Sequence, residues 1–494
     1  VETVAVYTEE GTGHRLVNCT FHNNNTTGSF AGAAEQIYSA ESGTIELKNC
    51  IVTTTIGTMR PLLNSFNNTI TVSYSNIQGG FTGIGNIQSN PLFINSDDPD
   101  GPDNIWATAD DGLNIQGCSP SKNTGTNTDA PAIDIVGTTR PQYGTVDMGV
   151  YETTLNPLVY SRVYVKANAS GANNGTSWDD AFTSLQSALG YPCLAPNAEI
   201  WVAAGTYRPT QNQFKSSTGA TDRSNTFLIP SGVSVYGGFI GGETDKNQRS
   251  LPTAGANGNT ILSGDLLGDD APSFANRTDN ALHVVLLNNV TEPTRLDGFV
   301  IKGGYADQNT EIYPSALVGS TNSNGSGLFN NAGGNNLTLA YCTVTDNHSL
   351  GEGGGMFTIA LSDGQGRSSL PLVTHCKFEN NKAGARGGGI SVLNGGGGAP
   401  FAAIGITAIN TQFTGNEAID GGGLSLRPIY GTATLSMDGC SVTNNTATGS
   451  GGGIALIPQG DAAIPSAVTA TINNTTISGN QIGNTVGNSG AGIS

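Results

Sequence analysis

The sequence is poor in charged residues, and basic residues are the scarcer kind. Lys and Arg number 20 and Asp and Glu number 38 among 494 residues, which gives a formal net charge of −18. Binding to nucleic acid or to an anionic membrane surface depends on basic side chains, so the composition disfavours both partners. The excess of carboxylates favours divalent cations instead.

The sequence also lacks a long hydrophobic stretch. No apolar run approaches the ~20 residues that a transmembrane helix requires, so no membrane span is expected in this segment. The opening residues, VETVAVYTEE, do not form a signal peptide. We therefore expect either that processing removed a targeting segment or that the chain is an internal piece of a longer protein.

Cysteine is sparse, and its spacing does not suit a metal. The seven cysteines are far apart and form no CxxC pair, which disfavours a zinc site. Five of them occur in one repeated sequence context, which predicts buried free thiols rather than disulfides; they are Cys19, Cys50, Cys342, Cys376 and Cys440.

Glycine is abundant, with 70 residues, and hydrophobic residues make up 36% of the chain in short, regularly placed runs. This pattern is typical of many short strands joined by tight turns. A seven-residue motif recurs among them, as NCTFHNN from Asn18, YCTVTDN from Tyr341, HCKFENN from His375, NTQFTGN from Asn410, GCSVTNN from Gly439 and NTTISGN from Asn474. NCIV from Asn49 and YSNIQGG from Tyr74 are weaker copies.

The second residue of the motif is small, the fourth is apolar and the seventh is Asn, and a glycine cluster such as GGGI follows most copies. Successive copies from Cys342 to Thr475 lie 34, 35, 29 and 35 residues apart, a period that suits one coil of a parallel β-solenoid. The small residues would stack as a Cys/Thr ladder, and the apolar residues would fill the core.

The seventh residue would sit at a turn, because Asn tolerates left-handed φ, and its amide would bond its counterpart in the next coil or nearby backbone. The glycines would allow unusual backbone angles and close contact between coils. Ligand binding by these Asn and Gly residues is the alternative, and we favour the structural interpretation.

Phe-x-x-Asn followed by Gly-Gly-x-Ile resembles the repeat of polymorphic outer-membrane proteins and the right-handed parallel β-helix repeats of large Bacteroidota surface proteins. The resemblance covers 323–494 well and 1–80 in part. RVYVKANASGANNGTSWDDAFTSLQSAL, from Arg162, resembles the N-terminal cap of those domains, and residues 85–152 resemble their closing segment. The resemblance implies an all-β fold of tandem right-handed parallel β-helix domains.

The expected organisation follows from these two flanking segments. Residues 1–152 would be the C-terminal coils and closing cap of one β-helix domain, 153–161 a linker, and 162–494 the N-terminal cap and coils of the next domain. A short capping helix is expected near the start of the second domain. Thr176 or Ser177 would cap it, Asp179 and Asp180 would lie in its first turn, and Trp178, Phe182, Leu185 and Leu189 would form its apolar face.

One acidic segment could hold a hard cation. Its six aspartates lie within fifteen residues and are the predicted metal ligands, with calcium as the expected ion: Asp97, Asp98, Asp100, Asp103, Asp110 and Asp111. The alternative is a solvated acidic cap loop. Asp265, Asp269 and Asp270 form a lesser cluster.

No catalytic constellation is recognisable, so we expect that the chain is not an enzyme. Polysaccharide lyases and hydrolases occur on β-helices, but no pair of carboxylates recurs on one face of the repeat. Arg386 and Lys382 lie near Glu379, yet the other copies of the repeat lack these charges. The five histidines show no metal spacing.

The two ends of the sequence are in register with each other. The distance along the chain from the apolar residue after a glycine cluster to the next small residue of the motif is 21, 16 and 21 residues in the interior of the sequence. If a second copy of the sequence followed Ser494, the same distance across the junction would be 20 residues. We therefore expect one circularly cut period of a tandem repeat whose partners are neighbouring copies, head to tail.

The resemblance implies a secreted, cell-surface adhesin or filament, similar to the giant type IX-secreted adhesins of Bacteroidota, with surface glycans or other surfaces as further partners. The alternative is a polysaccharide-binding or polysaccharide-degrading β-helix protein.

Overall fold

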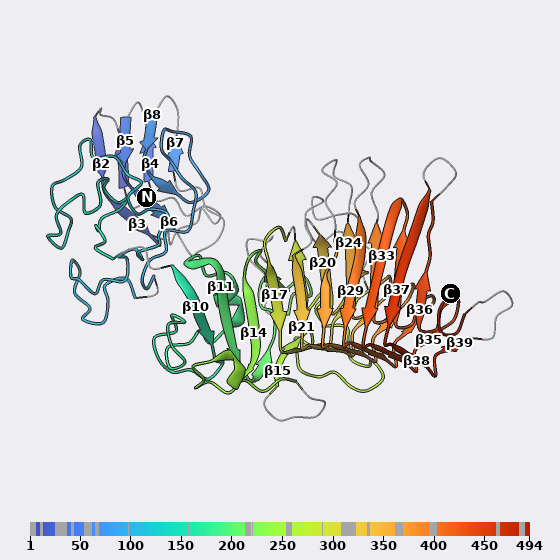
Figure 1. The fold of residues 1–494 in the computed structure, drawn as a ribbon. Coiled ribbons are helices and arrows are strands. Elements are labelled where there is room, and N and C mark those ends of the chain that lie inside the picture. Colours follow the sequence, from blue (N-terminus) through green and yellow to red (C-terminus); the bar gives the residue numbers. More distant parts are fainter. Residues whose placement is uncertain are drawn as a thin grey trace. The chain divides into compact units, whose positions relative to one another are not determined.

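The computed structural model describes residues 6–9, 13–24, 37–40, 44–53, 62–64, 69–96, 98–155, 159–212, 219, 221–252, 259–288, 290–307, 323–332, 336–360, 369–394, 403–460, 465–483 and 490–494. The chain divides into two compact units, Val1–Val159 and Tyr160–Ser494 (Figure 1). Each unit is described by itself below. Their regular structure is almost entirely β-strand, as the composition predicts.

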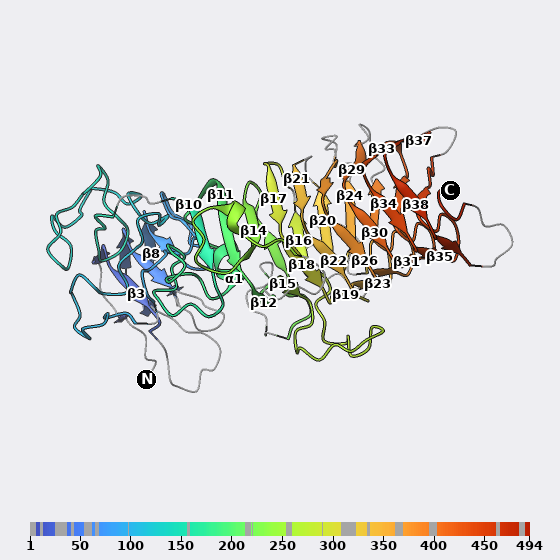
Figure 2. The ribbon, with the colours of Figure 1, turned by 60° about the horizontal axis from the view of Figure 1, so that its bottom comes forward.

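The described part of the second unit contains four parallel sheets (Figures 1 and 2). The nine-stranded sheet consists of β10 (Tyr160–Val165), β11 (Leu194–Ala203), β14 (Ser234–Phe239), β17 (Thr294–Asp297), β21 (Leu337–Ala340), β25 (Leu372–Thr374), β29 (Ile404–Ile409), β33 (Gly431–Asp438) and β37 (Ser466–Asn473). The eight-stranded sheet consists of β12 (Gly205–Tyr207), β15 (Thr260–Ser263), β18 (Phe299–Lys302), β22 (Thr343–Thr345), β26 (Lys377–Glu379), β30 (Gln412–Thr414), β34 (Ser441–Thr443) and β38 (Thr476–Ser478).

The other two sheets are shorter. The seven-stranded sheet consists of β13 (Phe227–Ile229), β16 (Val285–Asn288), β20 (Leu328–Ala332), β24 (Met356–Ala360), β28 (Ile390–Asn394), β32 (Leu424–Pro428) and β36 (Ile454–Leu456). The six-stranded sheet consists of β19 (Tyr305–Ala306), β23 (His348–Ser349), β27 (Lys382–Ala383), β31 (Glu417–Ala418), β35 (Thr446–Ala447) and β39 (Gln481–Ile482).

Consecutive strands of the second unit belong to different sheets. The chain passes through β20, β21, β22 and β23, one in each sheet, and then returns to the first of these sheets with β24. We call one such passage a rung. Each strand pairs in parallel with its counterpart in the next rung, as in β24 with β28 and β28 with β32. Parallel pairing requires a long connection between partners, and here the other three strands of the rung provide it.

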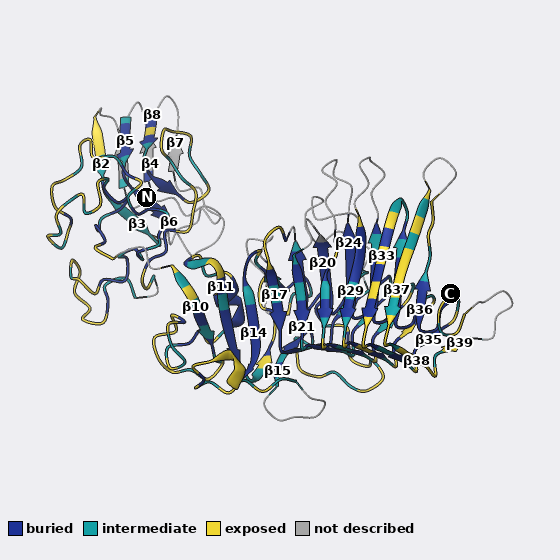
Figure 3. Ribbon diagram, in the orientation of Figure 1, coloured by how far each residue is buried: buried dark blue, intermediate teal, exposed yellow. Residues whose placement is uncertain are grey.

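The apolar fourth residue of the motif lies in the core, as predicted. Val344, Phe378, Phe413 and Val442 face one another in register and are fully buried. The rings of Phe378 and Phe413 stack with centroids 5.4 Å apart. Figure 3 shows buried residues along the middle strands of the unit. Stacking places the same face of every rung inward, so one buried residue in each rung makes a continuous core.

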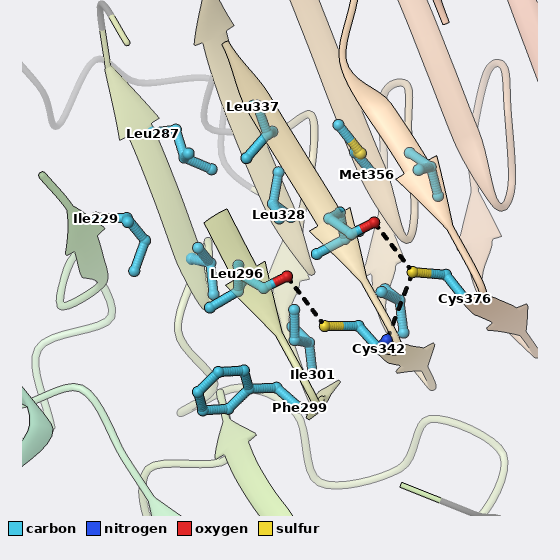
Figure 4. Close-up of a cluster of buried hydrophobic side chains, with 14 of the residues drawn as sticks. Ile229, Leu287, Leu296, Phe299, Ile301, Leu328, Leu337, Cys342, Met356 and Cys376 are labelled. Carbon is cyan, nitrogen blue, oxygen red and sulfur yellow. Dashed lines mark hydrogen bonds between the residues drawn. The ribbon is translucent and has the colours of Figure 1, made fainter. Parts of the chain in front are cut away.

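The small second residue forms the predicted ladder, and its five cysteines are free thiols. The backbone N–H of Cys342 donates to Cys376 Sγ at 3.5 Å, and that of Cys376 donates to Thr411 Oγ1 at 3.4 Å. The Cys376 thiol itself donates to the carbonyls of Leu339 and Thr374. The Cys342 thiol donates to the Leu296 carbonyl (Figure 4). The first unit repeats this arrangement, because the Cys50 thiol donates to the carbonyls of Leu16 and Lys48.

The seventh residue of the motif forms a second ladder, as predicted. The ladder consists of Asn347, Asn381, Asn416, Asn445 and Asn480. From Asn381 onward, the Oδ1 atom of each Asn accepts hydrogen bonds of 2.9–3.2 Å from the backbone N–H and the Nδ2 of the Asn one rung earlier. Nδ2 of each later Asn also donates to the carbonyl of the preceding rung's fourth residue, as from Asn416 to Phe378. The first four of these Asn residues are fully buried, and every contact satisfies a group that burial would otherwise leave unpaired.

The expectation of a left-handed backbone at the seventh Asn is wrong. Positive φ occurs instead at the sixth residue, such as Asn380 (55°) and Asn444 (56°), and at the first residue, such as His375 (54°). These residues make the corners before and after the short strand. The seventh residue must point its amide along the stack, so the tight turn is made by the residue before it.

The glycine clusters allow a left-handed backbone and close contact between rungs, as predicted. The first glycine of each cluster has positive φ, for example 62° at Gly387. The next two approach the following rung so closely that a side chain would not fit: a Cβ at Gly388 would lie 2.5 Å from the Glu417 carbonyl oxygen, and one at Gly389 would lie 2.5 Å from that of Gly423. Heavy atoms cannot approach this closely, so these positions require glycine.

The capping helix begins later than predicted. It is α1 (Leu185–Leu189), with Ser184 as its N-cap, so neither Thr176 nor Ser177 caps it. Ser177 instead closes a turn with Asp180, whose carboxylate accepts from the backbone of Ala172 in the glycine-rich loop. Residues 177–183 are thereby held out of the helix, and Phe182 forms a parallel bridge with Val165. One 3₁₀ turn, Lys246–Gln248, is capped by Asp245.

The described residues of the first unit form three short parallel sheets followed by irregular chain. The sheets pair β1 (Val6–Glu9), β4 (Ile37–Ala40) and β7 (Leu62–Asn64); β2 (His14–Val17), β5 (Thr44–Lys48) and β8 (Thr69–Ser73); and β3 (Thr20–His22), β6 (Ile51–Thr53) and β9 (Asn76–Ile77). The chain after β9 returns to these strands, because Gly149 N–H donates to the Asn49 carbonyl and Val150 N–H to Thr20 Oγ1. Phe93, Ile115, Met148 and Tyr151 pack there against Ile51.

The asparagine ladder generates a stability prediction. Asn416→Ala would remove the acceptor of two buried donors on Asn381, its backbone N–H and its side-chain amide, and the side-chain donor to the Phe378 carbonyl, so we expect the free energy of unfolding to fall by about 3 kcal/mol. Chemical denaturation of the full chain measures this loss. Asn480→Ala is the matched control, since Asn480 is half-buried and its loss should cost about 1 kcal/mol. Equal costs at the two positions would contradict the burial argument.

Candidate functional site

The predicted calcium loop uses its carboxylates to hold its own turns. Asp97 lies outside the described residues, and Asp98 and Asp100 are half-exposed. Asp103 Oδ1 accepts from the backbone of Ile105, while Asp110 accepts from Asp103 N and from the hydroxyl of Thr108. The Thr108 hydrogen bond lowers the pKa of Asp110. The carboxylates of Asp103 and Asp110 thus accept hydrogen bonds from other residues of the same loop.

Asp111 differs from its neighbours because it is buried, with 1% of its surface exposed. One of its oxygens accepts from Thr108, and the other accepts from the backbone of Ala107 and, in a short hydrogen bond, from the hydroxyl of Tyr151. Burial raises the pKa of Tyr151, and the nearby Asp111 carboxylate raises it further. Asp111 therefore anchors the loop to the core of the first unit.

A convergence of carboxylates occurs instead in the second unit. Among the described residues, Asp265, Asp269 and Asp279 each place one oxygen within 4.8 Å of the others. Carboxylate oxygens grouped at this spacing suit Ca²⁺. Asp265 and Asp269 belong to the lesser cluster seen in the sequence, whereas Asp279 was missed because ten residues separate it from Asp269. Its oxygen also accepts from Leu267 N–H, which keeps it close to the loop.

The third member of that predicted cluster, Asp270, takes a different role. Both of its oxygens accept from Asn280 Nδ2 at 3.1 Å, and the Arg277 guanidinium lies 3.5 Å away. Burial raises the pKa of Asp270, and Arg277 and Asn280 act in the opposite direction. Asp270 is therefore held by Asn280 and Arg277. The Asp265 carboxylate is held within its own loop too, because its Oδ1 accepts from the backbone N–H groups of Gly268 and Asp269.

A buried ion-pair network crosses three rungs of the second unit. Glu352, 6% exposed, accepts from Arg427 at 2.5 Å, from Arg386 at 3.4 Å and from the Ser391 hydroxyl at 2.8 Å. Arg386 also lies 3.4 Å from a carboxylate oxygen of Asp420. Carboxylates and basic groups do converge here, as a polysaccharide-cleaving site would require. Both oxygens of Glu352 are engaged within the protein, which is the arrangement of a structural network.

The first unit contains a polar cavity of about 560 Å³. It opens between the ends of β3 and β6 and the chain after β9, and its lining includes His22, Gln78, Gln88, Asn90, Phe93 and Gln116. None of these lining residues is predicted as a site from the sequence. The only signal was a local density of Gln and Asn in residues 76–90, which does not differ from turn composition elsewhere in the chain.

Comparison of the chain with protein-family models, curated proteins and solved structures found no match. None of the helices in the described part of the chain is long and apolar enough to cross a membrane. The interpretation of these sites therefore rests on their own geometry.

The ion-pair network generates a second prediction. In Glu352→Gln, the Arg386 and Arg427 guanidinium groups would lose their shared counter-charge in a largely buried setting, so the free energy of unfolding should fall by about 3 kcal/mol. Denaturant titration of the full chain measures the change.

Glu417→Gln is the control for this substitution. It removes an exposed pair with Lys382, 2.9 Å apart, and should cost less than about 1 kcal/mol. Unchanged stability in Glu352→Gln, together with loss of a polysaccharide-cleaving activity, would identify Glu352 as catalytic instead.

The calcium prediction remains to be measured, and the geometry separates the two acidic loops. We expect Asp269→Asn to weaken the affinity for Ca²⁺ at least ~10-fold and Asp103→Asn to leave it unchanged, as measured by calorimetric titration with Ca²⁺. The reverse order would assign the ion to the loop of residues 98–111. A melting curve that chelator does not alter, with no heat of binding, would exclude calcium from both loops.

Proposed function

We propose that this chain is a structural and adhesive component of a secreted cell-surface filament, built of tandem right-handed parallel β-helix domains joined head to tail. The parallel sheets with a period of one rung support the β-helix part of this proposal. In the second unit the asparagine ladder runs through the five rungs that carry the motif, and ladder hydrogen bonds also join the small residues Cys342 to Cys376, Cys376 to Thr411 and Cys440 to Thr475, as expected of a fold that extends by adding equivalent units.

The observation that carries the proposal is the equivalence of the rungs of the second unit, in which each strand pairs in parallel with its counterpart in the next rung. In the second unit, the last strands of the four sheets are β36, β37, β38 and β39. Val442 and Met437 in the preceding rung are fully buried, whereas their partners Ile477 and Ile472 are half-exposed. Figure 3 shows this change, with exposed and intermediate residues along β37. Under the proposal, a rung of a second copy packed against β37 and β38 would bury these two side chains.

The first unit presents an outermost rung of the same kind at its other end. Leu16, Cys19 and Phe21 are half-buried, while their partners in the next rung, Leu47, Cys50 and Val52, are fully buried. The motif residues also match across the two rungs: Cys19 corresponds to Thr475, Phe21 to Ile477 and Asn24 to Asn480. A following copy would therefore continue the small-residue ladder, the core and the asparagine ladder.

The mechanical role follows from this arrangement. Successive rungs are held together by backbone hydrogen bonds and core packing, and the rungs that carry the motif also by ladder hydrogen bonds, so extension is resisted by many bonds that must break together. The low content of Lys and Arg and the net charge of −18 keep the filament soluble in an extracellular setting. Secretion by the type IX route, which the sequence resemblance implies, remains part of the proposal.

A direct two-copy fusion, with Ser494 of one copy joined to Val1 of the next, tests the assembly. Pairing of the outermost rungs should slow amide hydrogen exchange in residues 466–483 of the first copy and 14–24 of the second by at least ~10-fold relative to the single chain. Exchange measured by mass spectrometry gives the result. Identical exchange in the fusion and the single chain would contradict head-to-tail stacking.

Two variants of the fusion show whether the protected rungs depend on the predicted contact. Ile477→Lys, at a core-facing position of β38, should abolish the added protection, because the charge would be buried between rungs. Thr469→Lys, at an exposed position of β37, should retain the protection. Equal effects of the two substitutions would show that the protection arises elsewhere.

A further inference from the structure

The cavity of the first unit has the size of a ligand-binding site. Its volume of about 560 Å³ lies within the range of small-molecule pockets, roughly 300–1,000 Å³. All of its described lining residues belong to residues 22–116, so the cavity is complete within the first unit.

The lining is polar but uncharged. It includes four primary amides, from Gln78, Gln88, Asn90 and Gln116, and no Asp, Glu, Lys or Arg among the described lining residues. An anionic or cationic ligand would find no counter-charge here, which is costly once the ligand is removed from water. A wholly apolar ligand would cover the Asn90 Nδ2 donor, which makes no hydrogen bond within the described part of the chain, and would leave it unsatisfied. The chemistry that remains is a neutral molecule rich in hydroxyl groups.

Part of the lining is fixed before any ligand binds. Pro91, Leu92 and Phe93 are buried, and the His22 ring packs edge-on against Phe93 with ring centroids 5.3 Å apart. His22 Nδ1 lies 3.0 Å from Thr53 Oγ1, and Gln116 Nε2 donates to the Phe93 carbonyl at 3.1 Å. These contacts restrain an aromatic and apolar wall, so little conformational freedom is lost there on binding.

The chain immediately before Pro91 offers exposed hydrogen-bonding groups to the cavity. Gln88, Ser89 and Asn90 are exposed residues that follow one another along the chain. Asn90 Oδ1 accepts from the Leu92 N–H at 3.0 Å, which orients the side chain, while its Nδ2 makes no hydrogen bond within the described part of the chain. An amide can both donate and accept, so neighbouring amides can bond adjacent hydroxyls of one sugar ring.

We propose that this cavity binds a short segment of an uncharged polysaccharide. The apolar wall of Leu92, Phe93 and the His22 ring would face the C–H surface of a sugar, and the amides of Gln88 and Asn90 would bond its hydroxyls. This inference names the target class of the adhesive function proposed above and rests on that function for its biological role. The binding itself requires only the first unit and no second copy.

The test is a glycan array probed with the single full-length chain, followed by calorimetry with the neutral oligosaccharide that binds best. We expect binding to neutral oligosaccharides and no preference for sulfated or uronic-acid ones. Exclusively anionic ligands, or no neutral ligand binding at millimolar concentration, would overturn the proposal. Because the single chain is used, a negative result here leaves the assembly test unaffected, and failure of stacking leaves this binding test valid.

Two substitutions locate the site. Gln88→Ala removes an exposed amide, and Asn90→Asp keeps the oxygen that accepts from Leu92 while replacing the NH₂ donor, so both variants should fold normally. Each should weaken binding of the neutral oligosaccharide about 10-fold through the loss of hydrogen bonds. Gln459→Ala, an exposed amide of the second unit, is the control and should bind as the unmodified chain does. Unchanged binding in both cavity variants would place the glycan site elsewhere and overturn the assignment.

Discussion

Parallel hydrogen bonding between one rung and the next is the constraint on which the rest of the structure depends. It requires every rung to present the same backbone path at the same height, so residues one period apart occupy equivalent places. A small residue must then stack on a small one, as Cys376 does on Thr411, and a glycine must face the next rung where Gly388 approaches Glu417. The asparagine ladder satisfies the polar groups that this stacking buries.

The same constraint explains where charged residues are tolerated. Stacking brings side chains from successive rungs together, so an isolated buried charge on one rung must find its partner on another. Glu352 receives Arg386 from the next rung and Arg427 from the one after it. The network thus forms along the stack, whereas the loops outside the repeat, which are free of the register, carry the acidic groupings and the polar cavity. In this protein the rungs provide length, and the irregular segments provide the surfaces on which specific recognition can arise.

The outermost rungs follow from the same physics. A stack of rungs has a strand edge at each end, and an edge with a half-exposed core residue, such as Ile477 or Phe21, favours further pairing. A cap removes such an edge, as α1 and the chain around it do at the start of the second unit, where Leu185 and Leu189 are buried against the first strands. The equivalence of the stacked rungs is the feature on which the proposed filament rests.

The sequence by itself determined the parts of the structure that repeat. The motif spacing identified the free-thiol ladder, the buried fourth residue and the stacked seventh Asn, because a periodic fold makes each of them visible many times. Tertiary structure decided what occurs once. The turn between Ser177 and Asp180 makes the helix begin later than the sequence pattern predicts, and Glu352 forms an ion pair with Arg427, which lies 75 residues further along the chain. The cavity likewise joins segments far apart in the chain. Such contacts depend on how non-repeating loops fold back, and no local pattern encodes that path.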